Sequence, residues 1–478
     1  MENKHPQIIQ GGMGIGVSNW RLAREVSKLG QLGVVSGTAM NSILIRRLQD
    51  GDPGGHMRRA LAAFPFQEIS HKLITNYFIE GGKLKDKPYK RIPMFQLPPS
   101  KDFLQQNVAS CFVEVWLAKE GHKGLVGINL LEKIQLPNLS ALYGAMLANV
   151  DYVIMGAGIP REIPGALDQL AVNNTARIKI SIEGSNEDFI YEFNPNDIFD
   201  LKDMNNLQRP YFFPIVSSAT LALNLKKKAT GRVDGFIVEG PLAGGHNAPP
   251  RGQLNLNERG EPIYGSRDEV NLSDMKALDL PFWVAGNYAT PDKLKEVEGL
   301  GAQGIQVGTL FAFCEESGVD SEFRIQALEE IRDNPPPHGG WIFTDIRSSP
   351  TGFPFKASLL SGSIGKQDVY EQRPRICDLG YLRHAYQKNE GGVGLRCPAE
   401  PVKDYIKKLG NEIDTVGRKC LCNALFADVG YGQIQNDGYR ELPLLTAGDD
   451  LNNIQRMFKD GSVIYSAKDV IEYLLSIT

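Results

Sequence analysis

Short runs of consecutive apolar residues recur along the N-terminal part of the chain, and many of them end in glycine. They lack the polar alternation of half-exposed strands, which is typical of strands covered on both faces of a parallel sheet. Segments with helical spacing of apolar residues, such as 102–119 and 139–147, separate them. This alternation predicts a (β/α)8 TIM barrel, an α/β fold. The predicted strands are 8–10, 32–37, 125–130, 152–155, 211–216, 236–238, 282–286 and 304–308.

Two stretches interrupt the alternation and predict insertions near 64–100 and 176–205. In the second, 177–182 alternates polar and apolar residues and is followed by a similar run at 189–193, which predicts an antiparallel hairpin. Beyond about residue 365 the alternation ends. We therefore expect a barrel domain over 1–365 and a mainly helical C-terminal appendage over 366–478.

Capping signals predict where two helices begin. Ser18 precedes the first helical pattern and is expected to be its N-cap. Ser466 and Asp469 form a capping box before an amphipathic stretch near the C-terminus. That last helix should dock on the body of the protein or on a second subunit, which leaves a homo-oligomer open.

The sixth predicted strand leads into a glycine-rich loop with one histidine. Glu239 ends the strand, and Gly244, Gly245 and His246 follow in the loop. Glycines permit positive φ angles and close approach of the backbone to a ligand. His246 would thus lie at the carboxyl end of the barrel, where such folds carry their chemistry, although a purely structural loop histidine is an alternative at this point.

Glycines also follow the last two strands. Ala285, Gly286 and Asn287 come after the seventh strand, and Gly308 and Thr309 come after the eighth. Backbone N–H groups in these two loops, with the Thr309 hydroxyl, would bind a dianion, and barrels recurrently bind phosphate there. The pattern predicts a cofactor that carries a phosphate group; tight turns that need glycine for geometry alone are the alternative.

The composition of the chain limits the classes of partner that it can bind. The chain has 478 residues, 42% of them hydrophobic and 23% charged, with a net charge of −4, which is typical of a globular protein and offers no basic surface for nucleic acid. The opening residues hold no secretory signal, and no apolar run is long enough to span a membrane, so we expect a cytoplasmic protein that does not bind membranes.

Four of the six cysteines lie in the appendage, at Cys377, Cys397, Cys420 and Cys422. Such a cluster could ligate zinc or an iron–sulfur centre, but the spacings fit no standard motif. Buried small apolar side chains are the favoured interpretation, and no metal is expected. His338 and His384 have no ligand partners nearby in sequence and are expected at the surface.

The glycine-rich segments together resemble a known family. Gln10-Gly-Gly-Met13-Gly, Gly127-Ile-Asn129-Leu, Ala-Gly-Gly-His246, Ala285-Gly286 and Gln306-Val-Gly308-Thr309 are similar to motifs of nitronate monooxygenases, also called 2-nitropropane dioxygenases. Members are FMN-dependent barrels, related to flavin-dependent enoyl reductases. The resemblance covers about residues 7–360, since the segment 344–356 also resembles the one that closes over the flavin.

The resemblance implies a role for each matching residue. His246 would be catalytic, and Gly286, Gly308 and Thr309 would hold the FMN phosphate. Gly12 and Met13 would contact the flavin ring through their backbone. The remaining residues of the implied flavin site are Gly14, Asn129, Glu239, Gly244, Gly245, Ala285 and Asn287.

The implied activity is that of an FMN-dependent oxidoreductase that oxidises a small nitronate, or a related acidic carbon substrate, with O2. An enoyl-thioester reductase acting on acyl-carrier-protein substrates, with NAD(P)H as reductant, is the alternative. A flavin-free barrel that binds a phosphorylated ligand is a hypothesis of a different class. Pro249 and Pro250 stiffen the loop after His246, so the substrate pocket should differ from that of simple nitroalkane oxidisers.

Overall fold

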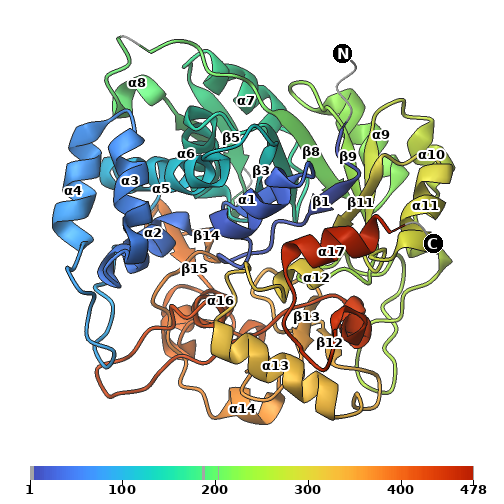
Figure 1. The fold of residues 1–478 in the computed structure, drawn as a ribbon. Coiled ribbons are helices and arrows are strands. Elements are labelled where there is room, and N and C mark those ends of the chain that lie inside the picture. Colours follow the sequence, from blue (N-terminus) through green and yellow to red (C-terminus); the bar gives the residue numbers. More distant parts are fainter. Residues whose placement is uncertain (1–4, 186–188, 203, 477–478) are drawn as a thin grey trace.

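The computed structural model describes residues 5–185, 189–202 and 204–476. Eight strands form one sheet in the order β1-β11-β10-β9-β8-β4-β3-β2 (Figure 1). Every pairing in the sheet is parallel, and a bridge between Ile9 and Leu32 joins β1 to β2. The predicted (β/α)8 barrel is therefore confirmed. Its strands are β1 (Ile8–Gln10), β2 (Gly33–Ser36), β3 (Val126–Leu131), β4 (Tyr152–Gly156), β8 (Tyr211–Val216), β9 (Phe236–Glu239), β10 (Phe282–Ala285) and β11 (Gly304–Val307).

Large apolar side chains fill the interior of the barrel. Trp283, Phe213 and Tyr152 come from three different strands and are almost fully buried there. The Trp283 indole N–H donates to the Pro6 carbonyl at 2.9 Å, so its one polar group is satisfied. A packed interior leaves the carboxyl end of the strands as the place for a ligand.

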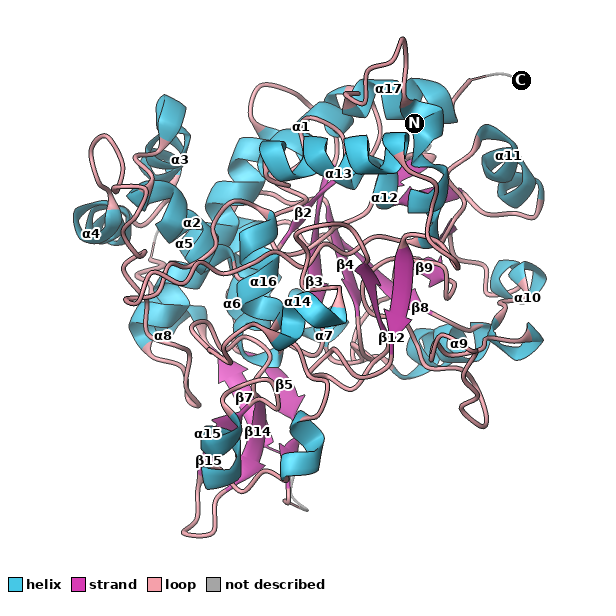
Figure 2. Ribbon diagram, turned by 90° about the horizontal axis from the view of Figure 1, so that it is seen from below, coloured by secondary structure: helices cyan, strands magenta, loops and turns pink. Residues whose placement is uncertain are grey.

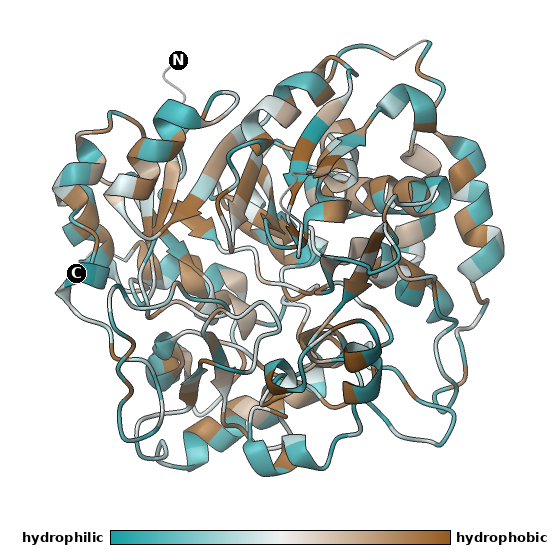
Figure 3. Cartoon of the chain, turned by 180° about the vertical axis from the view of Figure 1, so that it is seen from behind, coloured by the Kyte–Doolittle hydropathy of each residue, from teal (hydrophilic) through white to brown (hydrophobic). Residues whose placement is uncertain are grey.

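Helices cover the outside of the sheet and present polar residues to solvent (Figure 3). Those that follow barrel strands are α1 (Trp20–Lys28), α2 (Met40–Gln49), α6 (Gln135–Leu147), α7 (Ile163–Ala171), α9 (Ala219–Lys228), α11 (Pro291–Gly299), α12 (Thr309–Ala312) and α13 (Ser321–Asp333). α5 (Lys101–Lys119) precedes β3, and α10 (Leu272–Lys276) precedes β10.

One predicted cap is wrong. α1 is capped by Asn19, whose side chain accepts the Leu22 N–H, and not by Ser18. The Ser18 hydroxyl instead donates to the Gly11 carbonyl at 2.8 Å and accepts the Met13 N–H at 2.8 Å. Ser18 therefore fixes the glycine-rich turn after β1, and this turn competes with the helix for the serine.

The two predicted insertions have structure of their own. The first begins directly after α3 (His56–Ala63) and contains α4 (Gln67–Tyr77) and an irregular stretch before α5. The second forms the predicted antiparallel hairpin of β5 (Ala176–Ile180) and β7 (Phe189–Phe193), with β6 (Ile182–Glu183) between them and α8 (Pro195–Ile198) after them. Residues 186–188 and 203 of that insertion lie outside the described part of the chain, as do residues 1–4, on which the expected lack of a secretory signal partly depends.

The C-terminal part, which is the chain after residue 365, contains strands as well as helices. β14 (His384–Gln387) pairs with β15 (Val393–Arg396) and with β6, so this part of the chain forms a three-stranded sheet with a strand of the second insertion (Figure 2). Before it, β12 (Ile342–Asp345) and β13 (Phe355–Ser358) form a hairpin. The helices after them are α14 (Gln367–Glu371), α15 (Val402–Lys407), α16 (Leu421–Asp428) and α17 (Ala467–Leu474), with 3-10 helices at Glu412–Thr415 and Asp449–Met457.

The last helix docks on the barrel. α17 begins with the predicted capping box, in which the Ser466 hydroxyl accepts the Asp469 N–H, and it packs against α1, α11 and α12. A division of the chain at residue 365 stays a prediction. Over the described residues, no helix is both long enough and apolar enough to cross a membrane.

Candidate functional site

A cavity of about 240 Å³ opens at the carboxyl ends of the barrel strands. Its walls include every residue that the sequence predicted for the flavin and for catalysis: Gly12, Met13, Gly14, Asn129, Glu239, Gly244, Gly245, His246, Ala285, Gly286, Asn287, Gly308 and Thr309. The structure thus gathers these residues around one space, as their positions at strand ends require. The roles predicted for them remain predictions.

The turn after β1 forms one wall and is held rigid by polar contacts. The buried Gln10 side chain donates to Ser18 Oγ at 2.8 Å and accepts the Val34 N–H at 2.9 Å. A Cβ at Gly12 would lie 2.1 Å from the Asn129 Cβ, so only glycine fits beside that asparagine. This turn therefore presents bare backbone to the cavity, with the Asn129 side chain next to it.

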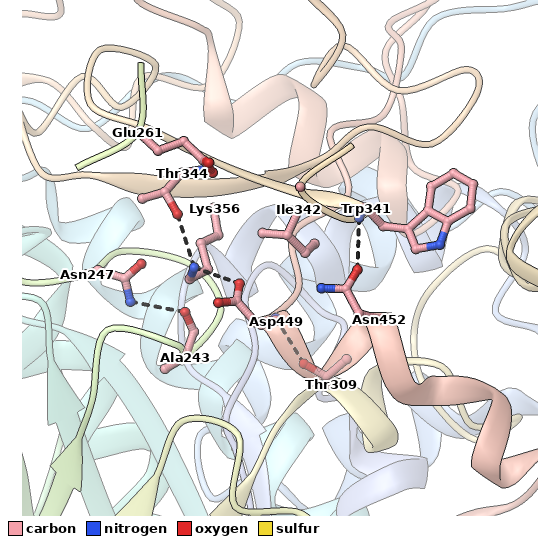
Figure 4. Close-up of polar contacts among 12 residues, drawn as sticks. Ala243, Asn247, Glu261, Thr309, Trp341, Ile342, Thr344, Lys356, Asp449 and Asn452 are labelled. Atoms are coloured by element: carbon pink, nitrogen blue, oxygen red, sulfur yellow. Dashed lines mark hydrogen bonds and ion pairs between the residues drawn. The ribbon is translucent and has the colours of Figure 1, made fainter. Parts of the chain in front are cut away.

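The loops after β10 and β11 form the wall where a phosphate is predicted. Gly286 has a φ of 97° and Asn287 a φ of 65°, so the first loop uses left-handed backbone. Thr290 caps α11 by accepting the Lys293 N–H, and Pro291 is its first residue. The Thr309 hydroxyl accepts the Gly448 N–H at 2.9 Å, which brings the C-terminal part onto this loop (Figure 4). Among the residues that the structure describes, the Thr309 hydroxyl donates to none, so its proton remains available to a ligand.

His246 lies half-buried in the loop after β9. Its Nε2 is 2.7 Å from Ser349 Oγ, and its ring meets Phe355 edge-on with a centroid distance of 4.9 Å. Burial, and then the nearby Lys133 ammonium, lower the pKa of His246 from 6.5 to about 4. The imidazole is therefore neutral at physiological pH, and Ser349 fixes its orientation.

Ser349 is a site residue that could not be identified from the sequence. It is fully buried, and its hydroxyl also pairs with Thr351 Oγ1 at 2.8 Å. It belongs to the segment 344–356 that resembles a flavin-covering segment, but no local pattern distinguishes Ser349 from Ser348 beside it. Only the contact with His246 separates the two.

Glu239 is half-buried at the end of β9, on the cavity wall. Burial raises the pKa of Glu239 from 4.5 to about 8. A carboxyl with such a pKa keeps its proton at neutral pH and can act as a donor. The strand end thus supplies a neutral acid close to the loop that carries His246.

The C-terminal part completes the cavity, which the sequence did not predict. Its lining residues are mostly apolar: Tyr381, Leu382, Leu421, Cys422, Leu425, Asp428, Leu445, Thr446, Ala447, Gly448 and Asp450. Burial also raises the pKa of the Asp428 carboxyl well above its ordinary value. Asp450 is ion-paired with Arg456 at 2.7 Å.

The cavity fits FMN. Gln306 Oε1 is buried beside the cavity and, within the described chain, has no hydrogen-bond partner; a ring N–H of a flavin would satisfy it. A Cβ at Gly308 would meet nothing closer than the Met13 sulfur at 3.6 Å, so the glycine leaves open space at the predicted phosphate position. Bare backbone at Gly308, and at Gly286 in the loop before α11, suits an anion.

The appendage cysteines are thiols, and Cys397, Cys420 and Cys422 are buried. In the described residues no group of three or more His, Cys, Asp or Glu side chains is arranged to hold a metal ion. His338 is exposed, as expected. His384 is not simply a surface residue, since it is half-buried and lies 2.8 Å from the Glu183 carboxylate across the β14–β6 pairing. The sequence around His384 could not reveal Glu183, because the two residues lie far apart along the chain.

Comparisons with known proteins agree with the predicted resemblance. Residues 169–334 match the family model described as nitronate monooxygenase. This segment begins within α7 and ends directly after α13, so it includes the His246 loop and the two loops, after β10 and β11, that are predicted to bind phosphate. The match confirms the resemblance and, with it, the prediction of an FMN-dependent oxidoreductase. Among curated proteins none matches the chain.

Solved structures with similar folds include FabK from Thermotoga maritima, at 15% identity and a TM-score of 0.48, covering 99% of this chain and 92% of that one. Nitroalkane oxidase from Streptomyces ansochromogenes has 14% identity and a TM-score of 0.46, covering 98% and 94%. The enoyl reductase domain of MlnA, from the macrolactin biosynthesis cluster of Bacillus amyloliquefaciens, has 10% identity and a TM-score of 0.44, covering 98% and 92%.

Proposed function

We propose that this FMN-dependent oxidoreductase acts on a substrate that is uncharged at its reacting end, and that it is an enoyl-thioester reductase using NAD(P)H. The observation that carries the proposal is the charge of the cavity. Among the described residues no Lys or Arg lines it, and burial raises the pKa values of Glu239 and Asp428. An anionic nitronate would find no cationic side chain in these walls, since the Lys133 ammonium that acts on His246 is exposed and lies outside them, whereas a neutral thioester needs none.

Bound FMN would supply a ring that accepts a hydride from one substrate and delivers it to another. The Gly286, Gly308 and Thr309 loops would hold its phosphate, and Gln306 would accept a hydrogen bond from its ring. The turn at Gly12 and Met13 would lie against the ring, since this turn exposes backbone to the cavity.

His246 would orient the substrate rather than protonate it. With a pKa of about 4, it carries a single ring proton at neutral pH. If the Ser349 hydroxyl donates to Nε2, that proton is on Nδ1 and can donate to a thioester carbonyl oxygen. Polarising this carbonyl makes the β-carbon of the enoyl group a better hydride acceptor.

Glu239 would supply the proton that the α-carbon needs after hydride transfer. Its carboxyl has a pKa of about 8 and lines the same cavity. A donor with a pKa near the working pH is the most effective general acid. Glu239 is thus the proposed general acid, and His246 is the proposed orienting group.

Nitronate oxidation is the second candidate, because residues 169–334 match the nitronate monooxygenase family model. If the substrate entered as the neutral nitroalkane, His246 would have to take its acidic α-proton to form the nitronate. A pKa of about 4 makes the imidazole a weak base for this task. The environment of His246 therefore favours the reductase.

Anaerobic mixing experiments distinguish the enoyl-thioester reductase from the nitronate oxidase. The purified protein should have a flavin spectrum, NADPH should bleach it rapidly, and an enoyl thioester such as crotonyl-CoA should restore it. Bleaching by a nitronate alone would favour the oxidase instead. A colourless protein that cannot be reconstituted with FMN would leave the flavin-free, phosphate-binding barrel as the better hypothesis.

A further inference from the structure

A buried ion pair connects the β12–β13 hairpin to the C-terminal part, close to the cavity. Lys356 Nζ lies 2.8 Å from Asp449 Oδ1 and donates to Thr344 Oγ1 at 3.0 Å (Figure 4). The Lys356 side chain is 4% exposed and that of Asp449 is 29% exposed. An ammonium group so far from water requires its partners, so the pair fixes the position of Asp449.

The residues next to Asp449 contact both sides of the cavity. The Thr446 hydroxyl donates to the Lys356 carbonyl at 2.6 Å and accepts the Gly245 N–H at 3.0 Å, directly before His246. The Gly448 N–H donates to Thr309 Oγ1 at 2.9 Å. The segment Leu445–Asp450 therefore contacts the histidine loop with one residue and the predicted phosphate loop with another.

Backbone contacts reinforce this arrangement. The Asp449 N–H donates to the Leu242 carbonyl at 3.1 Å, and the Lys356 N–H donates to the Gly245 carbonyl at 2.9 Å. A Cβ at Gly244 would lie 2.7 Å from the Ala447 carbonyl carbon, so the two segments are in close contact. Nothing in the proposed chemistry requires a lysine here, because Lys356 does not line the cavity.

We propose that Lys356 and Asp449 are positioning residues that hold Leu445–Asp450 against the His246 loop and Thr309, and so complete the cofactor site. The inference rests on the proposed function for its ligand, FMN. It predicts that loss of the pair weakens FMN binding and turnover together, because one segment supports both loops.

The test uses the full chain with Lys356→Met and Asp449→Asn, separately and combined. Lys356→Met keeps the aliphatic stem and removes the charge. Lys459→Met is the matched control, because Lys459 pairs with Asp469 at the same distance of 2.8 Å in the C-terminal part but is 65% exposed. Melting temperature, FMN affinity from flavin fluorescence, the absorption spectrum of bound flavin and kcat are measured for each variant.

We expect Lys356→Met to weaken FMN binding at least about tenfold and to change the flavin absorption bands, with Lys459→Met unchanged. The double variant should be no worse than the stronger single variant, because both remove the same interaction. FMN affinity, spectrum and kcat like those of the Lys459→Met control would overturn the inference. If Lys356→Met fails to fold, the same comparison is made with Asp449→Asn, whose side chain is the more exposed of the pair.

Hydrogen–deuterium exchange tests the inference without flavin. Peptides that span 243–248 and 445–450 should exchange faster in Lys356→Met than in the parent protein or in Lys459→Met. Unchanged exchange in both peptides would overturn the positioning role. If the parent protein binds no FMN, the proposed function fails, while this exchange result still decides whether the ion pair holds the two loops.

Discussion

At the scale of single residues, the site is defined by ionisable groups that burial keeps neutral. The pKa of His246 is lowered to about 4 and that of Glu239 is raised to about 8, both chiefly because burial disfavours the charged form. The two groups are on one loop and on the strand that leads into it. Each therefore has a predictable response to substitution and to pH.

Replacing His246 by alanine should lower turnover by about 10²- to 10⁴-fold, since an orienting and polarising group is lost. FMN content should stay close to that of the parent protein, because the phosphate loops are untouched. His338→Ala, at an exposed position, is the control. Unchanged turnover in His246→Ala would remove the histidine from the mechanism.

Glu239→Gln should make the flavin-free protein more stable at alkaline pH. The folded-state pKa of Glu239, about 8, lies above its ordinary value of 4.5, so the folded state binds more protons in that window and loses stability as pH rises through it. Glutamine resembles the protonated form and avoids this loss. Melting temperatures of the two proteins should nearly coincide at pH 4.5 and differ by several degrees at pH 9; equal values at both would contradict the raised pKa.

At the scale of elements, the strands could be predicted and the contacts between distant segments could not. Apolar runs such as 211–216 identify buried parallel strands because both faces of the strand are covered. Their carboxyl ends meet in a barrel, so His246 and Gly308 could be placed around one cavity from sequence alone. Ser349 and Thr446 could not, because nothing in their local sequence indicates the loop they contact. Ser18 was misassigned because a turn and a helix compete for the same hydroxyl.

The loop after β11 allows the predicted phosphate position to be tested directly. Gly308 has a φ of −105°, which other residues adopt, and an added Cβ would meet nothing closer than 3.6 Å. Gly308→Ala should therefore keep its melting temperature in the absence of flavin but bind FMN at least about tenfold more weakly, since the methyl group would project into the cavity. Gly265→Ala, where an added Cβ meets nothing within 4 Å, is the matched control. Normal FMN affinity in Gly308→Ala would place the phosphate elsewhere.

At the scale of the whole molecule, the barrel and the C-terminal part share one ligand cavity. Its walls run from Gly11 in the first loop to Asp450, and α17 returns to pack on α1. A ligand held between them should stabilise both parts. The C-terminal part could be predicted only as an appendage, because its hydrophobic pattern differs from that of the barrel and does not show that the two share a cavity.

FMN should accordingly raise the melting temperature of the whole chain in a single transition. At a free concentration of 100 times Kd, a ligand specific to the folded state adds about 2.7 kcal/mol. For a chain of this size that corresponds to a rise of a few degrees. Differential scanning calorimetry with and without FMN tests this, and two separate transitions of which only one shifts would show that the C-terminal part does not share the site.

The hydrogen bond from Gly245 to Thr446 also has a consequence for biosynthesis. A ribosome completes every barrel strand by residue 307, long before it reaches Thr446. Domains commonly fold as the nascent chain emerges, so the barrel can form while the cavity still lacks its last wall. Stable capture of the cofactor would then wait until residues 445–450 have been synthesised, and chains terminated before them would lack the contacts that support the His246 and Thr309 loops.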